Sequence, residues 1–434
     1  MKKILVITYY WPPSGGSGVQ RWMYFCQYLP EFGIEPYIIT VDEKKASYKF
    51  IDKTFESKVK NLKVYRTNTF ELLKFYSKII GGGEQKNIPL GFSGEEKPNT
   101  FQKISRYIRG NFFIPDARIG WNKFALAEAK KIITENGIDT VITTGPPHST
   151  HLMGLNLKKL LNIKWIADFR DPWTEIYYNK LLYRNNFSIK KDIALEYRVL
   201  NEANLVLTIG PSMREHLQQR LKKDNEKFYF IYNGYDLEAF KEIKQIKDKK
   251  KFTICHIGIL SESQPISTFI DALKKAFSET NEMKKYVKLQ FVGRVSPSII
   301  TEIKDNLPGI EVELVEYLPH KKSLEYMTNA DLLFNSLAEM ENSKLLISGK
   351  LMEYIATGNP ILCLGHPEGD AAKLLEEIDD ARVFDRNDKE GVYNFVNFIF
   401  NKWKISSNLI KKDYTKYSRH HTTQQLSELI KNLN

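Results

Sequence analysis

The chain has 434 residues, of which 42% are hydrophobic, and a formal net charge of +12. This length exceeds one ordinary hydrophobic core and suits two domains of about 200 residues each. The charge favours an anionic partner, but the basic residues are dispersed and no nucleic-acid-binding motif occurs, so we expect no nucleic acid partner.

The first expected element is a buried strand at residues 4–8, "ILVIT", followed by the loop "WPPSGGSG" and a helix. The helix is indicated by apolar residues at helical spacing, namely Val19, Trp22, Met23, Cys26 and Leu29. Gly15, Gly16 and Gly18 allow close approach of a ligand to the backbone, and helix N-termini attract phosphate. The spacing fits neither a dinucleotide fingerprint nor a P-loop.

Further apolar strands alternate with helical segments through the first half of the chain. They are expected at 36–41, 140–145, 164–169, 204–209 and 228–234. This alternation indicates a parallel sheet covered on both faces. We therefore predict an N-terminal domain over residues 1–240, with an insertion at about 75–115 whose Gly-rich part, 78–99, reads as mobile.

The segment 101–113, "FQKISRYIRGNFF", predicts a basic amphipathic helix. Phe101, Ile104 and Ile108 form its apolar stripe, which Phe112 and Phe113 extend. Lys103, Arg106 and Arg109 lie beside the stripe and could reach lipid headgroups. We expect either contact with an anionic membrane or packing of the stripe against the N-terminal domain.

The charged run 241–251 is the predicted linker, after which the strand pattern restarts. Strands are expected at 252–258, 288–293, 311–317, 330–336 and 359–365. We predict a second domain at 250–410 and a C-terminal helix in 411–434 that packs back toward the first domain. The expected fold is α/β, with two doubly wound, Rossmann-like domains facing each other across a ligand-binding cleft.

The stretch "SGKLMEYIATGNPIL" at 348–362 carries the strongest chemical signal. Gly349 and Lys350 open a helix, where backbone N–H groups and an ammonium can hold a diphosphate. Glu353 shares their helix face and can accept hydrogen bonds from ribose hydroxyls. The alternative is an ordinary helix start at which Glu353 only complements the helix dipole.

Several motifs in chain order resemble the retaining GT-B glycosyltransferases of glycosyltransferase family 4. They are "PPSGGSG", "YNGYD", "HIGIL", "FVGR", "ADLLF" and "GKLMEYIATGNPIL". "TTGPPHSTHL", "DFRDPW" and "IPDARIGW" resemble a subgroup from surface-polysaccharide gene clusters, such as those for lipopolysaccharide or capsule. The resemblance implies transfer of a sugar from a nucleotide-diphosphate sugar to a glycan or lipid-linked acceptor, with retention of configuration.

The resemblance also implies roles for individual residues. The donor site would comprise Gly16, Ser17 and Gly18 in the mobile loop, Arg294, Gly349 and Lys350 at the diphosphate, Glu353 at the ribose, and the backbone near Tyr317 and Leu318 at the base. His148 or His151 would contact the donor sugar. Asp168, Arg170 and Asp171 follow a strand end and either orient the acceptor or form a structural ion pair.

The chain departs from the family pattern at three positions. Leu345 stands where the family often has a first glutamate, eight residues before Glu353. Ile259 and Gln264 replace a basic pair that binds phosphate, so Lys350 and Arg294 are expected to supply that charge. There is no Asp-x-Asp motif, and we expect neither a metal ion nor another cofactor.

Cys26, Cys255 and Cys363 are far apart and lie in apolar contexts. They predict buried thiols in a reducing compartment and show no metal-binding spacing. The N-terminal apolar run is too short for a signal peptide, and no stretch of 18 apolar residues occurs. We expect a cytoplasmic protein with peripheral contact to the inner face of the membrane.

Three other functions are compatible with parts of the pattern. A nucleotide-sugar 2-epimerase would share the fold but needs no acceptor, so the basic segment 101–113 argues against it. A dinucleotide-dependent oxidoreductase lacks the required glycine spacing and an evident ribose carboxylate. A non-catalytic nucleotide-sugar-binding protein is the third, because the basic pair is missing.

Overall fold

The computed structural model describes residues 1–48, 51–71, 100–221, 226–248, 250–279, 281–405 and 413–433. The chain forms two compact units. One comprises residues Met1–Tyr232 together with Thr422–Asn434, and the other comprises Asn233–His421. Most of the predicted insertion, residues 72–99, lies outside the described residues.

The first unit is built on a seven-stranded parallel sheet with the order β3-β2-β1-β4-β5-β6-β7. Its strands are β1 (Lys2–Ile7), β2 (Ile34–Val41), β3 (Lys63–Thr67), β4 (Thr140–Gly145), β5 (Lys164–Phe169), β6 (Leu205–Thr208) and β7 (Phe228–Phe230). The strand order reverses between β1 and β4, which pair in register from Ile4 with Thr140 to Ile7 with Thr143. In such sheets ligands bind beyond the carboxyl ends of the strands at this reversal.

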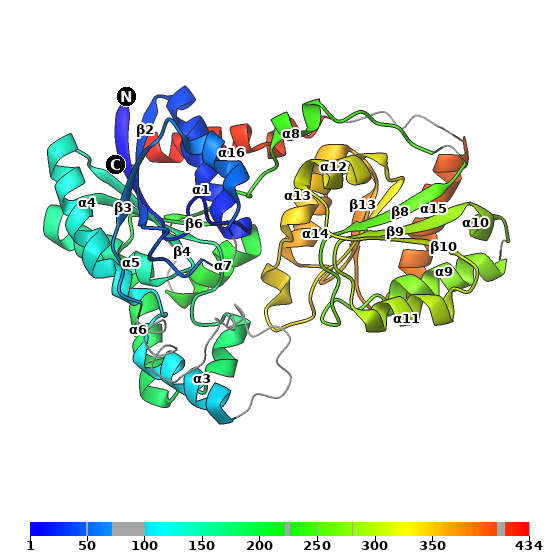
Figure 1. Ribbon diagram of the computed structural model, residues 1–434, viewed down its shortest axis with the longest axis horizontal. Coiled ribbons are helices and arrows are strands. Elements are labelled where there is room, and N and C mark those ends of the chain that lie inside the picture. Colours follow the sequence, from blue (N-terminus) through cyan, green and yellow to red (C-terminus); the bar gives the residue numbers. More distant parts are fainter. Residues whose placement is uncertain are drawn as a thin grey trace. The chain divides into compact units, whose positions relative to one another are not determined.

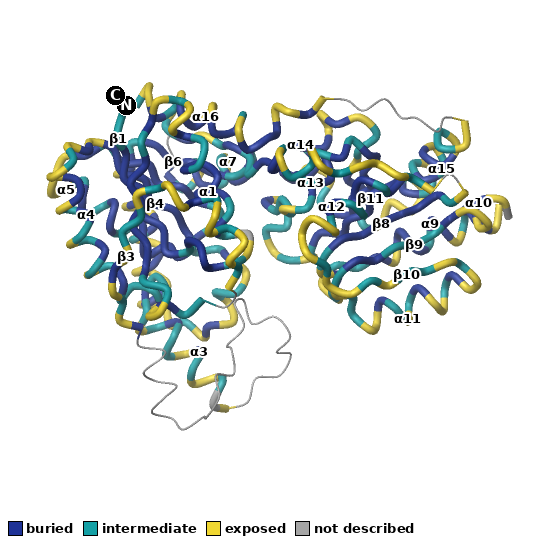
Figure 2. Tube along the Cα trace, turned by 45° about the horizontal axis from the view of Figure 1, so that its top comes forward, coloured by how far each residue is buried: buried dark blue, intermediate teal, exposed yellow. Residues whose placement is uncertain are grey.

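Helices cover both faces of this sheet (Figure 1). The helices of this unit are α1 (Ser17–Tyr28), α3 (Thr100–Phe112), α4 (Asn122–Asn136), α5 (Ser149–Leu161), α6 (Asn186–Glu202), α7 (Pro211–Arg220) and α16 (Arg419–Lys431), with 3-10 helices η1 (Leu29–Phe32), η2 (Lys53–Val59), η4 (Ile119–Trp121) and η5 (Tyr177–Leu182). Of these, α3 lies away from the sheet. Because both faces are covered, the central strands are almost wholly buried (Figure 2).

The C-terminal helix α16 completes the core of the first unit. Leu426 and Ile430 of α16 are buried in one cluster with Trp22 of α1 and with Ile4 and Val6 of β1. The N-terminal strand also holds the helix through Lys2, whose Nζ donates to the carbonyl oxygen of Ile430 at 2.7 Å. The chain therefore returns to its first domain after completing the second.

The second unit is built on a six-stranded parallel sheet with the order β10-β9-β8-β11-β12-β13. Its strands are β8 (Phe252–Ile257), β9 (Val287–Val292), β10 (Glu311–Val315), β11 (Leu332–Ser336), β12 (Ile361–Leu364) and β13 (Ala381–Phe384). Its helices are α8 (Leu237–Lys241), α9 (Ser267–Glu279), α10 (Asn281–Tyr286), α11 (Pro297–Asn306), α12 (His320–Asn329), α13 (Gly349–Thr357), α14 (Asp370–Leu375) and α15 (Lys389–Ile405), with η6 (Ser343–Leu345) and η7 (Thr415–Tyr417).

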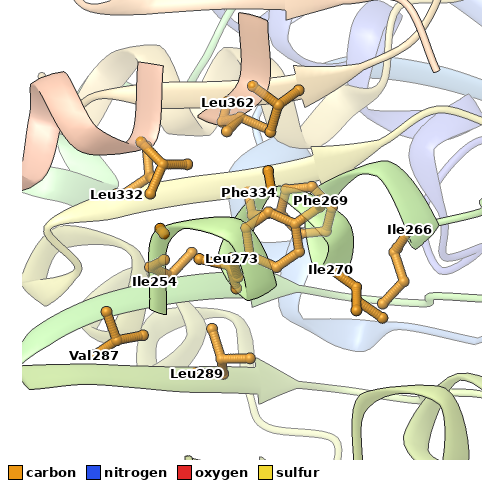
Figure 3. Close-up of a cluster of buried hydrophobic side chains, with 14 of the residues drawn as sticks. Ile254, Ile266, Phe269, Ile270, Leu273, Val287, Leu289, Leu332, Phe334 and Leu362 are labelled. Carbon is orange, nitrogen blue, oxygen red and sulfur yellow. The ribbon is translucent and has the colours of Figure 1, made fainter. Parts of the chain in front are cut away.

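One face of this second sheet packs against α9 and α15. Phe334 of β11 stacks on Phe269 of α9, with ring centroids 4.2 Å apart, and Leu273 and Leu332 lie in the same cluster (Figure 3). Each such buried side chain contributes about 1.5–3 kcal/mol relative to exposure. Against the opposite face lies α13, whose Tyr354 hydroxyl oxygen accepts a hydrogen bond from the Ile257 N–H at 3.0 Å.

The strand pattern of the sequence misses two strands, β3 and β13, which both lie at sheet edges. An edge strand is covered less completely, so its apolar run is shorter and harder to recognise. The domain boundary also lies earlier than the charged run 241–251. Residues in that run pack on the second unit, where Lys247 Nζ contacts Asp331 at 3.5 Å and Asn359 at 3.0 Å.

Candidate functional site

The strands β8 and β9 end in glycines that bring the backbone of the two strand ends into contact. Gly258 and Gly293 have φ values of +101° and +121°, which side-chain-bearing residues rarely adopt. A Cβ atom at position 293 would lie 2.5 Å from the carbonyl oxygen of Gly258. Only glycine permits this approach between the ends of β8 and β9, and β8 borders the point at which the strand order of the second sheet reverses, between β8 and β11.

The side chain of Lys350 lies over Gly258. A Cβ atom built on Gly258 would be 3.4 Å from Lys350 Nζ. The same Nζ atom is 3.4 Å from the carbonyl oxygen of Ile259. Burial lowers the pKa of Lys350 to about 8. A protonatable amine is therefore placed at the glycine-lined edge of the sheet, as diphosphate binding requires.

The imidazole of His256, on β8, is a second polar group in contact with this amine. Its Nδ1 lies 3.1 Å from the carbonyl oxygen of Phe334, so Nδ1 carries the proton and Nε2 is left as an acceptor. Nε2 is 3.4 Å from Lys350 Nζ. Burial, and then the charge of Lys350, hold the pKa of His256 well below its usual value. No role for His256 is expected from sequence, although a histidine inside the apolar run "FTICHIG" is an available signal.

The N-terminus of α13 is open on the side of Gly349. A Cβ atom at Gly349 would meet nothing within 4 Å, and the N-cap Ser348 makes no side-chain cap hydrogen bond. The first N–H groups of a helix have no partner within the helix and carry a partial positive charge. Together with Lys350 they form a cationic end of α13.

Glu353, one turn further along α13, is held by a residue that the sequence analysis does not identify. Its Oε1 atom lies 2.7 Å from Nε2 of His320, the first residue of α12. This hydrogen bond raises the pKa of His320. Tyr317 and Leu318 precede α12, and the Tyr317 side chain is 89% exposed. Glu353 of α13, predicted for the ribose, is thus joined through His320 to the start of α12, which the residues predicted for the base directly precede.

Three positions decide where positive charge lies at this edge of the sheet. Arg294 directly follows Gly293 and is exposed, and its carbonyl oxygen accepts from the Leu260 N–H at 2.9 Å. The side-chain amide of Gln264 donates a hydrogen bond from Nε2 to the carbonyl oxygen of Ser336 at 2.7 Å. Since Lys350 Nζ touches the carbonyl of Ile259, its charge lies beside one of the two positions that lack a basic residue.

In the first unit, Arg170 joins the two loops at the reversal between β1 and β4. Its guanidinium donates to the carbonyl oxygens of Gly18, Gly145 and Pro146, the last at 2.6 Å. Gly16, the N-cap of α1, has a φ of +95°, and Ser17 begins the helix. Arg170 therefore positions the glycine loop. Its hydrogen bonds go to backbone carbonyl oxygens and are not directed at a site for the acceptor substrate.

Asp168 is fully buried, which favours the structural ion pair over acceptor binding, the two alternatives expected for it. Its Oδ1 accepts from Arg21 Nε at 3.2 Å and Nη2 at 3.1 Å. Its Oδ2 accepts from Trp22 Nε1 at 2.7 Å and Thr144 Oγ1 at 2.8 Å. These four bonds and the lack of exposure leave no access for a substrate. Asp168 is the buried ion-pair partner of Arg21, the structural alternative named for it.

Asp171 differs from Asp168 in its surroundings. It is half-buried, and within the described part of the chain no hydrogen bond holds its carboxylate. Burial raises its pKa, an effect that the charge of Arg170 opposes. Of the three acceptor-side candidates, Asp171 is the one whose oxygens remain available.

His148 and His151 lie together among aromatic rings. His148 stacks on Trp173 with centroids 5.2 Å apart, and His151 stacks on Phe169 at 4.5 Å. Burial lowers the pKa of His151 to about 3 and holds that of His148 well below its usual value. Both rings are therefore neutral, and they can exchange hydrogen bonds but not carry charge.

The two histidines differ in their access to a ligand. His151 Nδ1 is bonded to Thr143 Oγ1 at 2.9 Å, and the residue is fully buried. Neither ring nitrogen of His148 has a partner among the described residues. His148 lines a pocket of about 50 Å³ together with residues that include Arg109, Asp116, Trp173 and Tyr178. A buried polar atom without a partner calls for a water or ligand group, and Nε2 of His151 is also such an atom among the described residues. The geometry favours His148 as the ligand-facing residue because His148, unlike His151, lines the pocket.

The predicted cations of segment 101–113 divide between solvent and interior. Lys103 is exposed, whereas Arg106 is buried and Arg109 is half-buried and lines the pocket beside His148. The prediction that Arg106 and Arg109 reach lipid headgroups is therefore wrong, because both lie on the inner side of α3. In the apolar stripe, Ile104 is exposed and Ile108 is half-buried, while the side chain of Phe101 lies outside the described residues.

The described residues contain neither a metal-binding cluster nor a membrane-spanning helix. Among them, no group of three or more His, Cys, Asp or Glu side chains is placed to hold a metal ion. No helix in the described ranges is long and apolar enough to span a bilayer.

Comparison with known proteins confirms the resemblance to glycosyltransferase family 4 and the GT-B fold. Residues 91–239 match the family described as Glycosyltransferase Family 4. No curated protein matches the chain. A glycosyltransferase from Rickettsia africae superposes with a TM-score of 0.60 at 15% identity, covering 100% of this chain and 98% of that one.

Two other solved structures show the same architecture. A mutant of Staphylococcus aureus TarM, in complex with fondaparinux, alpha-GlcNAc-glycerol and UDP, has a TM-score of 0.53 at 13% identity and covers 100% and 97% of the two chains. A structure described as a UDP-N-acetylglucosamine 2-epimerase from Listeria monocytogenes has a TM-score of 0.53 at 10% identity, covering 99% and 96%. At these identities the likeness establishes the fold.

Proposed function

We propose that this chain, which matches glycosyltransferase family 4 over residues 91–239 and has the GT-B fold, is a retaining glycosyltransferase. It moves a sugar from a nucleotide-diphosphate sugar to a glycan or lipid-linked acceptor in the synthesis of a bacterial surface polysaccharide. The observation that carries the proposal is the position of Lys350 Nζ over Gly258, next to the N-terminus of α13.

The proposed chemistry at this position is electrostatic. When the bond between the anomeric carbon and the diphosphate breaks, negative charge grows on the departing phosphate oxygen. Lys350 and the first N–H groups of α13 are already oriented toward such charge, so they stabilise the transition state more than the ground state. In this proposal they supply the positive charge that a divalent cation supplies elsewhere.

The nucleoside is assigned to the neighbouring helices. Glu353 accepts the ribose hydroxyls, and the backbone near Tyr317 and Leu318 receives the base. Because Glu353 Oε1 lies 2.7 Å from His320 Nε2, the histidine holds the carboxylate toward α12 and leaves Oε2 for the ribose. Arg294, at the end of β9, adds a second cation at the diphosphate.

The first unit contributes the groups proposed for the sugar and the acceptor. His148 is neutral and has two unpartnered ring nitrogens among the described residues, so it can bond a sugar hydroxyl without attracting free anions. Asp171 has available oxygens for an acceptor hydroxyl. Attack by that hydroxyl on the same face from which the nucleotide leaves retains the anomeric configuration.

The proposed location is the cytoplasm, with peripheral contact to an anionic membrane through residues 101–113. Three free, buried thiols support a reducing compartment. For the membrane contact, α3 offers Ile104 at 50% and Phe112 at 75% exposure, although Lys103 is its one exposed cation among those predicted.

A nucleotide-sugar 2-epimerase is the second candidate, because a structure described as one shares the fold. A non-catalytic binding protein remains as the third, since Ile259 and Gln264 are not basic. These functions differ in products. A transferase releases nucleoside diphosphate as the sugar moves to an acceptor or to water. An epimerase converts one nucleotide sugar into its epimer, without net release of nucleoside diphosphate. A binding protein does neither.

The test begins with thermal shifts of the protein in UDP-, GDP-, dTDP- and CMP-sugars. Nucleotide sugars that stabilise the protein are then incubated with it, and NMR follows the sugar. Release of nucleoside diphosphate together with a product of retained anomeric configuration supports the proposal. Release with inversion contradicts the retaining mechanism, and an epimeric nucleotide sugar identifies the second candidate.

A further inference from the structure

The helix α6 (Asn186–Glu202) buries three polar side chains on its inner face. Ser188, Asp192 and Glu196 are spaced four residues apart and are all buried. Two arginines from outside the helix pair with the acids: Arg184 Nη1 lies 2.8 Å from Asp192, and Arg220 Nη2 lies 2.8 Å from Glu196. The first three turns of the inner face of α6 are therefore held by ion pairs, and apolar packing of Val199 and Leu200 holds only its last turn.

The outer face of α6 carries an apolar stripe beside its exposed basic residues. Phe187 is 74% exposed, and Ile189, Ile193 and Tyr197 follow one another at four-residue spacing with 39–48% exposure. Residues at this spacing form one stripe along a helix. A helix on the surface of a globular protein normally has the opposite arrangement, with its apolar stripe toward the core.

Neighbouring elements extend this stripe. Asn111 of α3 donates from Nδ2 to the carbonyl oxygen of Tyr183 at 3.1 Å and accepts from the Asn185 N–H at 2.8 Å, so α3 and the start of α6 are joined. The exposed apolar and aromatic residues of these three segments are Ile104, Tyr107 and Phe112 of α3, Tyr177, Leu181 and Tyr183 in and after η5, and Phe187, Ile189, Ile193 and Tyr197 of α6. We call this set the α3–α6 surface.

The exposed charges around the α3–α6 surface are almost all basic. Over residues 100–112 and 177–198, every exposed charged side chain is basic, namely Lys103, Lys180, Lys190, Lys191 and Arg198, and the one exposed acid of α6 is Glu202 at its C-terminal end. The two acids in these ranges, Asp192 and Glu196, are buried in their ion pairs. Exposed apolar residues flanked by lysines, with several tyrosines, match the interface of an anionic bilayer.

We propose that α6 is a second membrane-contacting helix and that the α3–α6 surface docks on anionic phospholipid. A second copy of this chain fits less well, because apposing two such surfaces would bring like charges together. The inference deepens the membrane contact proposed for residues 101–113 and implies that the acceptor is lipid-linked. The assignment of α6 itself rests on its burial pattern and charges.

The test is co-sedimentation with phosphatidylglycerol vesicles and with phosphatidylcholine vesicles, at low and high salt. The wild-type chain should pellet with phosphatidylglycerol at low salt and be released by salt. Ile193→Glu/Tyr197→Glu alters only outward residues and should lower vesicle binding at least 10-fold. Phe398→Glu, at an exposed phenylalanine of α15, is the matched control and should bind as the wild type does.

A charge-reversal pair tests the electrostatic part. Lys190→Glu/Lys191→Glu should weaken binding to phosphatidylglycerol by about 30-fold or more, since each basic residue near an anionic surface contributes about 1 kcal/mol. The control is Lys284→Glu/Lys285→Glu, which reverses two adjacent exposed lysines on α10. Thermal unfolding should show that all four variants are folded.

Three results would overturn the inference. They are failure of the wild type to bind phosphatidylglycerol, binding of the α6 variants equal to that of the wild type, or a concentration-dependent dimer in sedimentation velocity that Ile193→Glu/Tyr197→Glu abolishes. Hydrolysis of the nucleotide sugar in solution separates the two proposals. The α6 variants should keep the hydrolytic activity of the wild type. If the wild type itself has no such activity, the proposal of a transferase is contradicted, whereas the result with vesicles still stands.

Discussion

Lys350 Nζ and His256 Nε2 lie 3.4 Å apart, although the two residues are 94 positions apart in the chain. The histidine uses its other nitrogen on the carbonyl oxygen of Phe334, so it offers Lys350 an acceptor and cannot compete for negative charge. With the Ile259 carbonyl oxygen also 3.4 Å from Nζ, the ammonium is held by two acceptors and keeps one proton for a ligand. The proposed function places the departing diphosphate at this ammonium.

Replacing Lys350 with methionine should lower kcat by about 100-fold, the usual cost of losing one preorganised donor to transition-state charge. KM for the donor should rise less, because charge on the diphosphate grows as the sugar departs. Steady-state kinetics check this. Lys344→Met, which removes an exposed lysine from the preceding turn, should leave both constants unchanged.

The same lysine predicts a pH dependence. Because burial lowers its pKa to about 8, Lys350 is charged below that pH and loses its proton as the pH rises through it. In the wild type, kcat/KM should therefore fall above about pH 8, and in Lys350→Met this alkaline limb should disappear. An identical limb in both enzymes would assign the titration to another group.

Glu353→Ala should weaken donor binding by about 1.5–3 kcal/mol, the range for hydrogen bonds to a charged group. Isothermal calorimetry with the nucleotide sugar identified in the thermal-shift panel measures the change. His320→Ala is the control, since it removes the 2.7 Å partner of Glu353 but keeps the carboxylate. Equal affinity of Glu353→Ala and wild type would remove the ribose role.

Phenylalanine substitutions should separate His148 from His151. His148→Phe keeps the stack on Trp173 and removes two nitrogens that have no partner among the described residues, so the unfolding free energy should not fall while turnover does. His151→Phe leaves the Thr143 hydroxyl without its 2.9 Å partner and should cost about 1–3 kcal/mol of stability. Urea unfolding and initial rates provide the two readouts. If His148→Phe turns over donor normally, the ligand-facing role fails.

Asp168→Asn should destabilise the first unit by about 3–5 kcal/mol, because it leaves the buried guanidinium of Arg21 without a counter-charge. Urea unfolding followed by tryptophan fluorescence measures the loss. Asp171→Asn should not destabilise the chain, since burial already raises the pKa of Asp171 and disfavours its charge. Comparable losses from both changes would contradict the different surroundings of the two acids.

Local sequence identified most of the strands and the helix that carries Lys350 and Glu353. A parallel strand covered on both faces needs a continuous apolar run, which is visible within a few residues, as in "TVITTG" of β4. The same reasoning could not orient α3, because periodicity locates an apolar stripe but does not say which side of the helix faces the domain. Arg106 and Arg109 lie on the inner side of α3, whereas local sequence left membrane contact and packing against the domain as open alternatives.

What the sequence determined by itself is the order of elements, the glycines at the strand ends, and the chemical types available near them. The tertiary structure decided which of these groups meet. Asp168 could be named as charged, but its burial depends on Arg21 and Trp22, 147 and 146 positions away. The roles of His256, His320 and the inward acids of α6 could be assigned only once the structure showed which residues they contact. The reason is physical: apolar periodicity and glycine sterics act within one turn or strand, whereas a hydrogen bond between strand β8 and helix α13 requires the order of the strands in the sheet, which no local window of sequence contains.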